Sequence, residues 1–359
     1  MEFVYKFPVV RGVQAKKEYY IAMVPLNMIE RLFPNDDEYV LPEYRAQRKL
    51  NEARVPIICK YIIDNRDSYV FSALAASIDG RFTYKPNPEN ADTGMLEVSM
   101  DARFLINDGQ HRKAAILEAI KEDESLGSET IPIVFFEDKG LARSQQIFTD
   151  LNKNAVKTSN SISELYDSRD IMAVVTRNVI TANDFLNTFT DKEKDILGKF
   201  SSNLFTLNTF YTANKYVFSS VDPEVQQKDE DFLKRFWNAV TANMVPWTEL
   251  QDKEISKVDL RENYIATQGI VIQALGRVGR YFYEHPEVNI EKTLKSLQRV
   301  NWKRNDRQWK MRAVRENGRI ITNKHAALLI ANSIKKTIEI PLSEDEKAEE
   351  EKLERIVSK

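Results

Sequence analysis

Residues 103–120 constrain the fold of this chain more than any other stretch. They begin with a short hydrophobic run, 103–107, which is typical of a buried strand. Asp108-Gly109 follows, and this dipeptide is a strong turn signal because glycine adopts backbone angles that are closed to other residues. Residues 113–120, Lys-Ala-Ala-Ile-Leu-Glu-Ala-Ile, are mostly strong helix formers. The sequence therefore predicts a strand, a tight turn and a helix in immediate succession.

The chemistry of this turn favours the binding of anions. The backbone N–H groups that open a helix have no partner within it and carry partial positive charge, so helix starts bind phosphate groups. Asp108 adds a carboxylate, His111 a titratable imidazole and Arg112 a guanidinium that matches phosphate. We therefore expect a phosphate-binding loop formed by Asp108, Gly109, Gln110, His111 and Arg112. An ordinary turn, with Asp108 as the cap of the helix, is an equally good interpretation of these residues.

The same turn also allows an enzymatic interpretation. A nucleoside triphosphate such as ATP, accompanied by Mg²⁺, could bind there and be hydrolysed. Arg112 would neutralise phosphate charge, and Asp108 or His111 would position the attacking water, so these three would be the catalytic residues. Such a protein would be an ATPase-like hydrolase or a DNA-nicking enzyme. No metal ligands are assigned, because one cysteine, Cys59, and three histidines make a zinc site of the Cys/His kind improbable.

Residues 108–112, Asp-Gly-Gln-His-Arg, also resemble the signature of the DGQHR-domain family. Residues 44–62, 69–74 and 146–155 are similar to segments that flank the signature in that family. Residues 302–319 resemble more particularly the DndB branch, whose members belong to bacterial DNA phosphorothioation (DNA sulfur modification) clusters. The DGQHR domain is in turn similar to the ParB/sulfiredoxin superfamily.

The resemblance implies a fold and a function. The fold is α/β, of the α+β kind: a ParB-like N-terminal domain with a mixed sheet and flanking helices, then a mainly helical C-terminal domain. The function is that of a DNA-binding transcriptional regulator, which represses its own phosphorothioation gene cluster and binds nucleotide phosphate at the signature loop. The resemblance also makes Asn152 a candidate partner of that loop. Arg48, Asn51 and Arg54 share one predicted helical face and could line the same pocket, although surface ion pairs explain them equally well.

A block of positive charge near the C-terminus favours contact with DNA. Residues 295–336 contain twelve lysines and arginines against two acids, Asp306 and Glu316. Such a block suits the DNA backbone, with an affinity that depends on salt, and Trp302 and Trp309 could lie against sugars or bases. In the alternative interpretation, the arginines pair with acids elsewhere and the tryptophans belong to the core. The residues that we expect to contact DNA are Lys303, Arg304, Arg307, Lys310, Arg312, Arg315 and Arg319.

Composition sets the broad class and the partners. The net charge of −2 creates no global attraction to nucleic acid or membrane, and no apolar run approaches the roughly 18 residues that cross a bilayer. A single cysteine and the absence of a signal-peptide pattern predict a cytoplasmic protein. The expected partner is double-stranded operator DNA. Because operators read by protein dimers are two-fold symmetric, we also expect a homo-oligomer, although no helix-turn-helix is recognisable.

We expect four segments: a signature domain (1–160), which the resemblance implies is ParB-like, a helical domain (161–294), a basic DNA-contacting region (295–342) and a charged tail (343–359) that forms a solvated or frayed helix. Two strand pairs are expected, the last predicted strand completing a β-α-β unit around the signature. Strands are expected at 3–10, 18–24, 69–78, 95–100, 103–107 and 131–136, and helices at 43–65 (interrupted at Pro56), 110–121, 141–152, 171–180, 205–216, 231–243 and 261–284.

Overall fold

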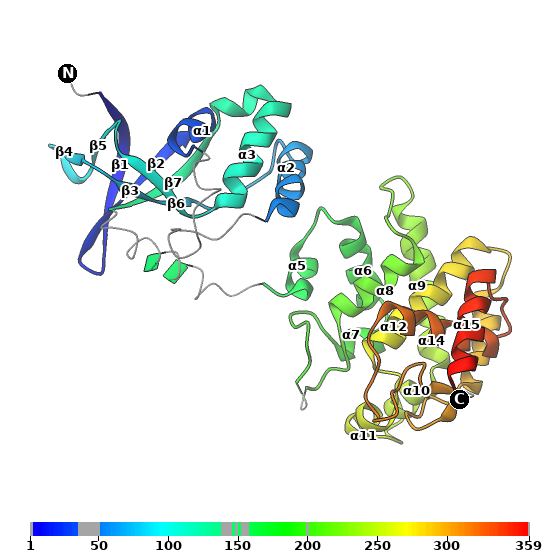
Figure 1. The fold of residues 1–359 in the computed structure, drawn as a ribbon. Helices are drawn as coiled ribbons and strands as arrows, with labels where there is room; N and C mark the ends of the chain where they lie inside the picture. Colours follow the sequence, from blue (N-terminus) through cyan, green and yellow to red (C-terminus); the bar gives the residue numbers. More distant parts are fainter. Residues whose placement is uncertain are drawn as a thin grey trace. The chain divides into compact units, whose positions relative to one another are not determined.

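The structure is a computed structural model that describes residues 3–34, 51–137, 146–147, 150–151, 158–198 and 201–357. The chain divides into two compact units, Met1–Val156 and Lys157–Lys359. The first unit combines a sheet with helices and the second is mainly helical (Figure 1), which confirms the predicted fold class. The finer division into four segments and the likeness to ParB proteins stay predictions.

A mixed sheet of seven strands forms the first unit. Its spatial order is β4-β5-β1-β2-β7-β3-β6. Neighbouring strands run antiparallel, except for β3 and β7, which are parallel. The strands are β1 (Val4–Gln14), β2 (Lys17–Pro25), β3 (Leu74–Asp79), β4 (Phe82–Asn87), β5 (Asn90–Ser99), β6 (Arg103–Asp108) and β7 (Thr130–Glu137).

The first predicted strand pair is confirmed, and the second is wrong. β1 and β2 form a hairpin whose turn residues, Ala15 and Lys16, both have positive φ, as the tight turns that match strand twist require. The predicted strands 95–100 and 103–107 do not pair, because β5 lies between β4 and β1 whereas β6 pairs with β3 at the far edge. The predicted β-α-β unit is also wrong: β3 separates β6 from β7, and these two run in opposite directions.

Three helices pack together on one side of this sheet (Figure 1): α1 (Ile29–Leu32), α2 (Val55–Asp64) and α3 (Gln110–Glu122). Pro56 lies in the first turn of α2, as predicted, where the missing N–H removes no helical hydrogen bond. Short 3-10 helices, η1 (Leu26–Met28), η3 (Glu52–Arg54) and η4 (Glu124–Ser128), complete the unit. The predicted helix 141–152 and the start of the helix 43–65 lie largely outside the described residues.

The second unit is a helical bundle with a large aromatic core. The helices expected at 171–180, 205–216 and 231–243 are confirmed, but the one at 261–284 is broken between Asn263 and Gly269. The elements are α5 (Asn160–Tyr166), α6 (Ile171–Thr181), α7 (Asp184–Phe189), β8 (Thr190–Asp191), β9 (Phe205–Thr206), α8 (Leu207–Val217), α9 (Gln226–Asn243), α10 (Val245–Gln251), α11 (Lys257–Asn263), α12 (Gly269–Glu284), α13 (Ile290–Leu294), η5 (Lys295–Arg299), η6 (Arg307–Trp309), α14 (Lys324–Thr337) and α15 (Glu344–Val357).

The helix α12 packs against α8 and α14 (Figure 1). Its Gly276 allows α8 to approach closely, since a Cβ atom there would lie 2.1 Å from the carbonyl oxygen of Ala213. Trp237 is fully buried nearby, and its Nε1 donates a hydrogen bond of 2.8 Å to Oδ1 of Asn214. The aromatic residues of this unit therefore form its core, as the sequence predicted. Within the described part of the chain, no helix combines the length and the apolar character needed to cross a membrane.

The C-terminal helix α15 differs from the solvated or frayed helix that the sequence predicted. It packs on α14, and both Glu350 and Leu353 are buried. Lys335 Nζ of α14 donates to Oε1 of Glu346 at 2.6 Å, and both side chains are largely enclosed. The high charge of this helix therefore serves partly to bind it to the basic helix before it.

Candidate functional site

The signature residues lie where β6 ends and α3 begins, so the predicted strand, turn and helix are confirmed. Gly109 has a φ of 104°, which non-glycine residues rarely adopt. A Cβ atom at this position would also lie 2.3 Å from Cδ2 of Leu74. The Lys113 N–H donates to the carbonyl oxygen of Gly109 at 2.9 Å and closes the first turn of the helix. Both the backbone angle and the packing therefore require glycine here.

The guanidinium of Arg112 is held by the protein itself. Its Nη1 donates to the carbonyl oxygens of Ser72 (2.6 Å) and Ala73 (2.8 Å) and to the Ser72 hydroxyl (2.5 Å). Its Nη2 donates to Oδ2 of Asp108 at 2.7 Å, and the side chain is 16% exposed. Arg112 thus ties the start of α3 to the segment that enters β3. In this arrangement the two charged residues expected to handle phosphate serve the structure of the turn.

Asn51, one of the residues predicted to line the signature loop, contacts it. The backbone N–H of Asn51 donates to Nε2 of His111 at 3.1 Å, so the neutral imidazole carries its proton on Nδ1. Arg54 follows in η3 and is exposed. Gln110 is half-buried in the first turn of α3. The predicted partners Arg48 and Asn152 lie outside the described residues.

The side chains at this turn show whether it offers ligands for the Mg²⁺ that would accompany a nucleotide. Asp108 is the one carboxylate of the signature, and it is paired with Arg112. Over the described ranges, no group of three His, Cys, Asp or Glu residues could hold a metal ion. The side chains described at the turn thus offer Mg²⁺ no cluster of oxygen ligands. Phosphate binding here stays a prediction that rests on the position of the loop at a helix start.

The two tryptophans of the basic segment are core residues. Trp302 and Trp309 are 2% and 0% exposed, and their rings stack at 5.7 Å between centroids. Nε1 of Trp309 also donates to the carbonyl oxygen of Asn301 at 2.7 Å. The expectation that these rings contact DNA sugars or bases is therefore wrong. Instead, they anchor an irregular segment that runs from η5 to α14.

The anchored segment, residues 300–323 between η5 and α14, exposes five cations to solvent. Lys310 Nζ lies 3.6 Å from Oε1 of Glu316, a long and exposed ion pair. The other four, Lys303, Arg307, Arg315 and Arg319, have no carboxylate within 4.0 Å among the residues that the structure describes. The exposed cations are Lys303, Arg307, Lys310, Arg315 and Arg319.

Arg304 and Arg312, in contrast, are engaged by the protein. Nε and Nη2 of Arg304 donate to the carbonyl oxygen of Gly318 at 3.1 and 2.6 Å, which closes the loop between them. Arg312 forms an ion pair with Glu350 of α15, in which Nη2 lies 2.8 Å from Oε2. Nη1 of Arg312 also donates to the carbonyl oxygen of Leu329 at 2.6 Å. The basic segment therefore contains both kinds of arginine that the sequence allowed: exposed ones and paired ones.

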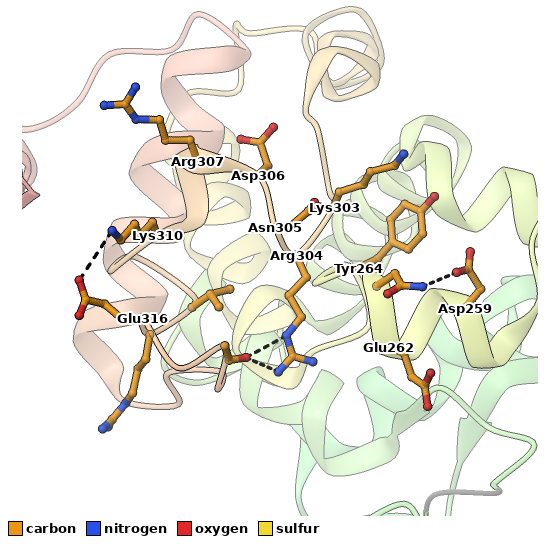
Figure 2. A pocket seen from close by; sticks show the side chains of 14 residues that line it. Asp259, Glu262, Tyr264, Lys303, Arg304, Asn305, Asp306, Arg307, Lys310 and Glu316 are labelled. Atoms are coloured by element: carbon orange, nitrogen blue, oxygen red, sulfur yellow. Dashed lines mark hydrogen bonds and ion pairs between the residues drawn. The ribbon is translucent and has the colours of Figure 1, made fainter.

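A pocket of about 900 Å³ opens among the exposed cations. Figure 2 shows Tyr264 and Asp259 on one side of it, Lys310 and Glu316 on the other, and Arg304 between them. The first side comes from α11 and the residues directly after it, and the second comes from the basic segment. The pocket thus joins two parts of the chain that lie about forty positions apart in the sequence.

Comparison with known families places the chain. A family model described as DndB, DNA-sulfur modification-associated, matches residues 7–341, which is most of its length. The chain belongs to the DndB family. This confirms the resemblance seen in the signature and its flanking segments, and it links the chain to DNA sulfur modification. No curated protein and no solved structure matches it.

The pocket is the feature of this DndB-family chain that sequence reasoning missed. Glu262 and Tyr264 lie at the start of the helix predicted at 261–284, Asp259 lies just before it, and no local pattern connects the three with the basic segment. The connection is made by backbone pairing between Tyr264 and Lys303. The sequence does contain one signal for the break in the predicted helix. Thr267-Gln268-Gly269 interrupts its apolar period and indicates a loop before Gly269.

Proposed function

We propose that this DndB-family protein binds double-stranded DNA through the exposed cations of its basic segment and represses the transcription of a phosphorothioation gene cluster. The observation that carries the proposal is the group of four exposed cations without a carboxylate partner among the described residues: Lys303, Arg307, Arg315 and Arg319. Exposed arginines and lysines that lack a carboxylate partner are suited to phosphate oxygens. The family's association with DNA sulfur modification supports DNA as the partner.

The salt dependence of binding tests this surface. Replacing Lys303, Arg307 and Arg315 together with alanine is expected to weaken binding to duplexes of any sequence. The slope of log K against log salt should fall by about 2.7, because each phosphate contact contributes about 0.9 through released counterions. Fluorescence anisotropy with a labelled duplex at several salt concentrations measures both quantities.

The matched control removes the same charge elsewhere in the second unit. Lys194, Lys228 and Lys292 are exposed and also have no ion-pair partner among the described residues. Their replacement with alanine is expected to change the slope by less than about 1, the contribution of a single phosphate contact. Equal slopes for the two triple variants would place the DNA surface outside the basic segment.

Deletion of the gene tests the regulatory role. Sulfur transfer to DNA needs a reactive thiolate or a metal cluster held by several cysteines. Cys59 is the one cysteine of the chain; it is buried, and its burial raises the pKa of the thiol. Because the proposed protein is a repressor, deletion of its gene is expected to raise transcription of the neighbouring modification genes, which transcript quantification measures. Because the chain has one buried thiol for sulfur transfer, deletion is also expected to leave sulfur in the DNA, which phosphorothioate-sensitive cleavage would show. Loss of DNA sulfur while those genes are still transcribed would contradict the proposal.

A two-fold operator would match a two-fold protein, so the proposed regulator is a homo-oligomer on DNA. Hydrolysis of a nucleoside triphosphate is the alternative function, and no contact among the described residues favours it. Binding of a nucleotide phosphate at the signature turn stays a prediction, as a possible signal that modulates DNA binding.

A further inference from the structure

We propose that the surface beneath the C-terminal helix α15 is a second part of the DNA-binding surface, and that α15 occupies it as an acidic competitor until DNA displaces the helix. The inference rests on the proposed function, which supplies the DNA. This covered surface consists of three cations and one imidazole from the basic segment and α14: Arg312, His325, Lys335 and Lys336.

Glu350 of α15 joins two of these cations. Its carboxylate accepts hydrogen bonds from both Nη atoms of Arg312, with Nη2 at 2.8 Å, and from Nζ of Lys336 at 2.7 Å. The Glu350 side chain is 4% exposed. A phosphate offers the same kind of anionic acceptor to guanidinium and ammonium groups. Glu350 therefore takes the place that a DNA phosphate would need at Arg312 and Lys336.

Two more acids of α15 cover the rest of this surface. Oε1 of Glu346 accepts from Nζ of Lys335 at 2.6 Å, and Oε2 of Glu349 lies 2.8 Å from Nε2 of His325. The helix as a whole holds seven acids against three bases. Its net negative charge therefore repels DNA at the same face where the cations beneath it would attract DNA.

The helix α15 is held on the covered surface by charge more than by apolar packing. Among its side chains that the structure describes, Leu353 is the one apolar side chain that is buried, whereas Ala348 and Ile356 are exposed. A helix of 14 residues is marginal in water without support from packing. Displacement also leaves no buried charge alone, because Glu350 returns to water while Arg312 meets a phosphate. A polyanion can therefore compete with this helix.

The covered surface is continuous with the exposed cations of the basic segment. Arg312 lies between Lys310 and Arg315 in the chain. The helices α14 and α15 lie side by side (Figure 1). The DndB family model matches residues 7–341, and α15 begins at Glu344. The covered cations thus belong to the part of the chain that matches the family, and the helix that covers them comes after it.

Hydrogen exchange in the full, unaltered chain tests the displacement directly. The amides of α15 are followed with and without a saturating DNA duplex at low salt. Because the freed helix is marginal by itself, these amides should exchange at least about tenfold faster in the DNA complex, whereas those of the core helix α12 should not exchange faster. Unchanged or slower exchange of α15 in the complex would overturn the proposal.

Two triple variants of equal charge separate occupation of the covered surface from general repulsion. The first neutralises the acids that contact the surface: Glu346→Gln, Glu349→Gln and Glu350→Gln. Glutamine can also form the capping box between residue 346 and Ser343 that starts the helix. The second neutralises exposed acids that make no ion pair outside α15 among the described residues: Glu344→Gln, Asp345→Asn and Glu351→Gln.

The affinity for a labelled duplex distinguishes the two triple variants. The first should bind at least about tenfold more tightly than the wild type, because α15 then blocks the surface for a smaller fraction of the time. The second should gain less than about threefold, since it changes only the screened field of exposed charges. Equal gains in the two variants, or no gain in the first, would contradict occupation of the surface by α15.

The cations under α15 are tested by two further replacements. Adding Lys335→Ala and Lys336→Ala to the first triple variant should lower the slope of log K against log salt by about 1.8, because two phosphate contacts of about 0.9 each are lost. The control adds Lys194→Ala and Lys228→Ala, which remove exposed lysines elsewhere in the second unit, and should lower the slope by less than about 0.9. Equal slopes would show that the covered lysines do not contact DNA.

The outcomes also separate this inference from the proposed function. If replacement of Lys303, Arg307 and Arg315 weakened duplex binding while the first triple variant gained no affinity, the covered surface alone would be refuted. If neither the wild type nor the first triple variant bound duplex, the DNA-binding role would be refuted, and this inference with it. Duplex binding that appeared only in the first triple variant would support both.

Discussion

Replacing Arg312 with alanine is expected to lower the free energy of unfolding of the second unit by about 3–5 kcal/mol, the cost of leaving a buried charge without its partner. The side chains of Arg312 and Glu350 are 12% and 4% exposed. Burial raises the pKa of Glu350, but the hydrogen bonds from Arg312 and Lys336 outweigh it, and the net shift is downward. The carboxylate is therefore charged in the folded protein and depends on these two cations.

The direction of this pKa shift also gives the pH dependence. Because the pKa of Glu350 is lower in the folded than in the unfolded protein, the pair stabilises the fold above the ordinary carboxylate pKa of about 4.3. This stability is lost as the pH falls through the folded pKa. The alanine variant should therefore lose less stability on acidification than the wild type does.

Urea unfolding followed by tryptophan fluorescence measures these effects, since all four tryptophans are buried in the second unit. The control is Arg299→Ala, which breaks an exposed ion pair with Glu339 and is expected to cost less than about 1 kcal/mol. Replacing Arg312 and Glu350 together with leucine should recover most of the loss, because neither charge is then left alone. If Arg312→Ala left unfolding unchanged but reduced the salt slope of DNA binding, Arg312 would be a DNA contact, as the sequence suggested.

The sequence was sufficient wherever the signal is local. The turn at Gly109 and the helix after it follow from residue types within a few positions. The helices of the second unit follow from apolar residues that recur at helical spacing. The partners of β5 and β6 in the sheet could not be predicted in this way. Strands adjacent in the sequence were expected to pair with each other, but β6 pairs with β3, and its Phe104 and Ile106 are buried in the core.

The site shows the same limit. Nothing near Arg112 in the sequence indicates that the backbone of Ser72 and Ala73 accepts its hydrogen bonds. An arginine at a helix start suits phosphate and suits carbonyl oxygens equally well, so only the fold distinguishes the two. The basic segment is similar: a count of charges gave its location but could not separate Arg312, which is buried against α15, from Arg307 and Arg315, which are exposed.

Replacing Arg112 with alanine is expected to destabilise the first unit by about 2–4 kcal/mol, because the carbonyl oxygens of Ser72 and Ala73 and the carboxylate of Asp108 lose their shared donor. Hydrogen exchange measures this loss of stability. Tryptophan fluorescence would not report on it, because all four tryptophans lie in the second unit. Protected amides of β3 and α3 should exchange about 30- to 700-fold faster. Arg103→Ala, which removes an exposed arginine from β6, is the matched control and should leave exchange nearly unchanged.

The same variants separate a structural arginine from a phosphate ligand. His111→Ala removes the acceptor of the hydrogen bond from the Asn51 N–H and is expected to affect exchange less than Arg112→Ala does. If the signature turn binds nucleotide phosphate, His111→Ala should weaken the binding of ATP with Mg²⁺, measured by equilibrium dialysis, without loss of structure. Arg112→Lys should restore little of the protection from exchange that Arg112→Ala removes, because lysine lacks the planar fork that reaches several acceptors at once. If Arg112→Ala abolished ATP binding while exchange stayed unchanged, the guanidinium would be a ligand of the nucleotide, and its contacts with Ser72, Ala73 and Asp108 would add little to stability.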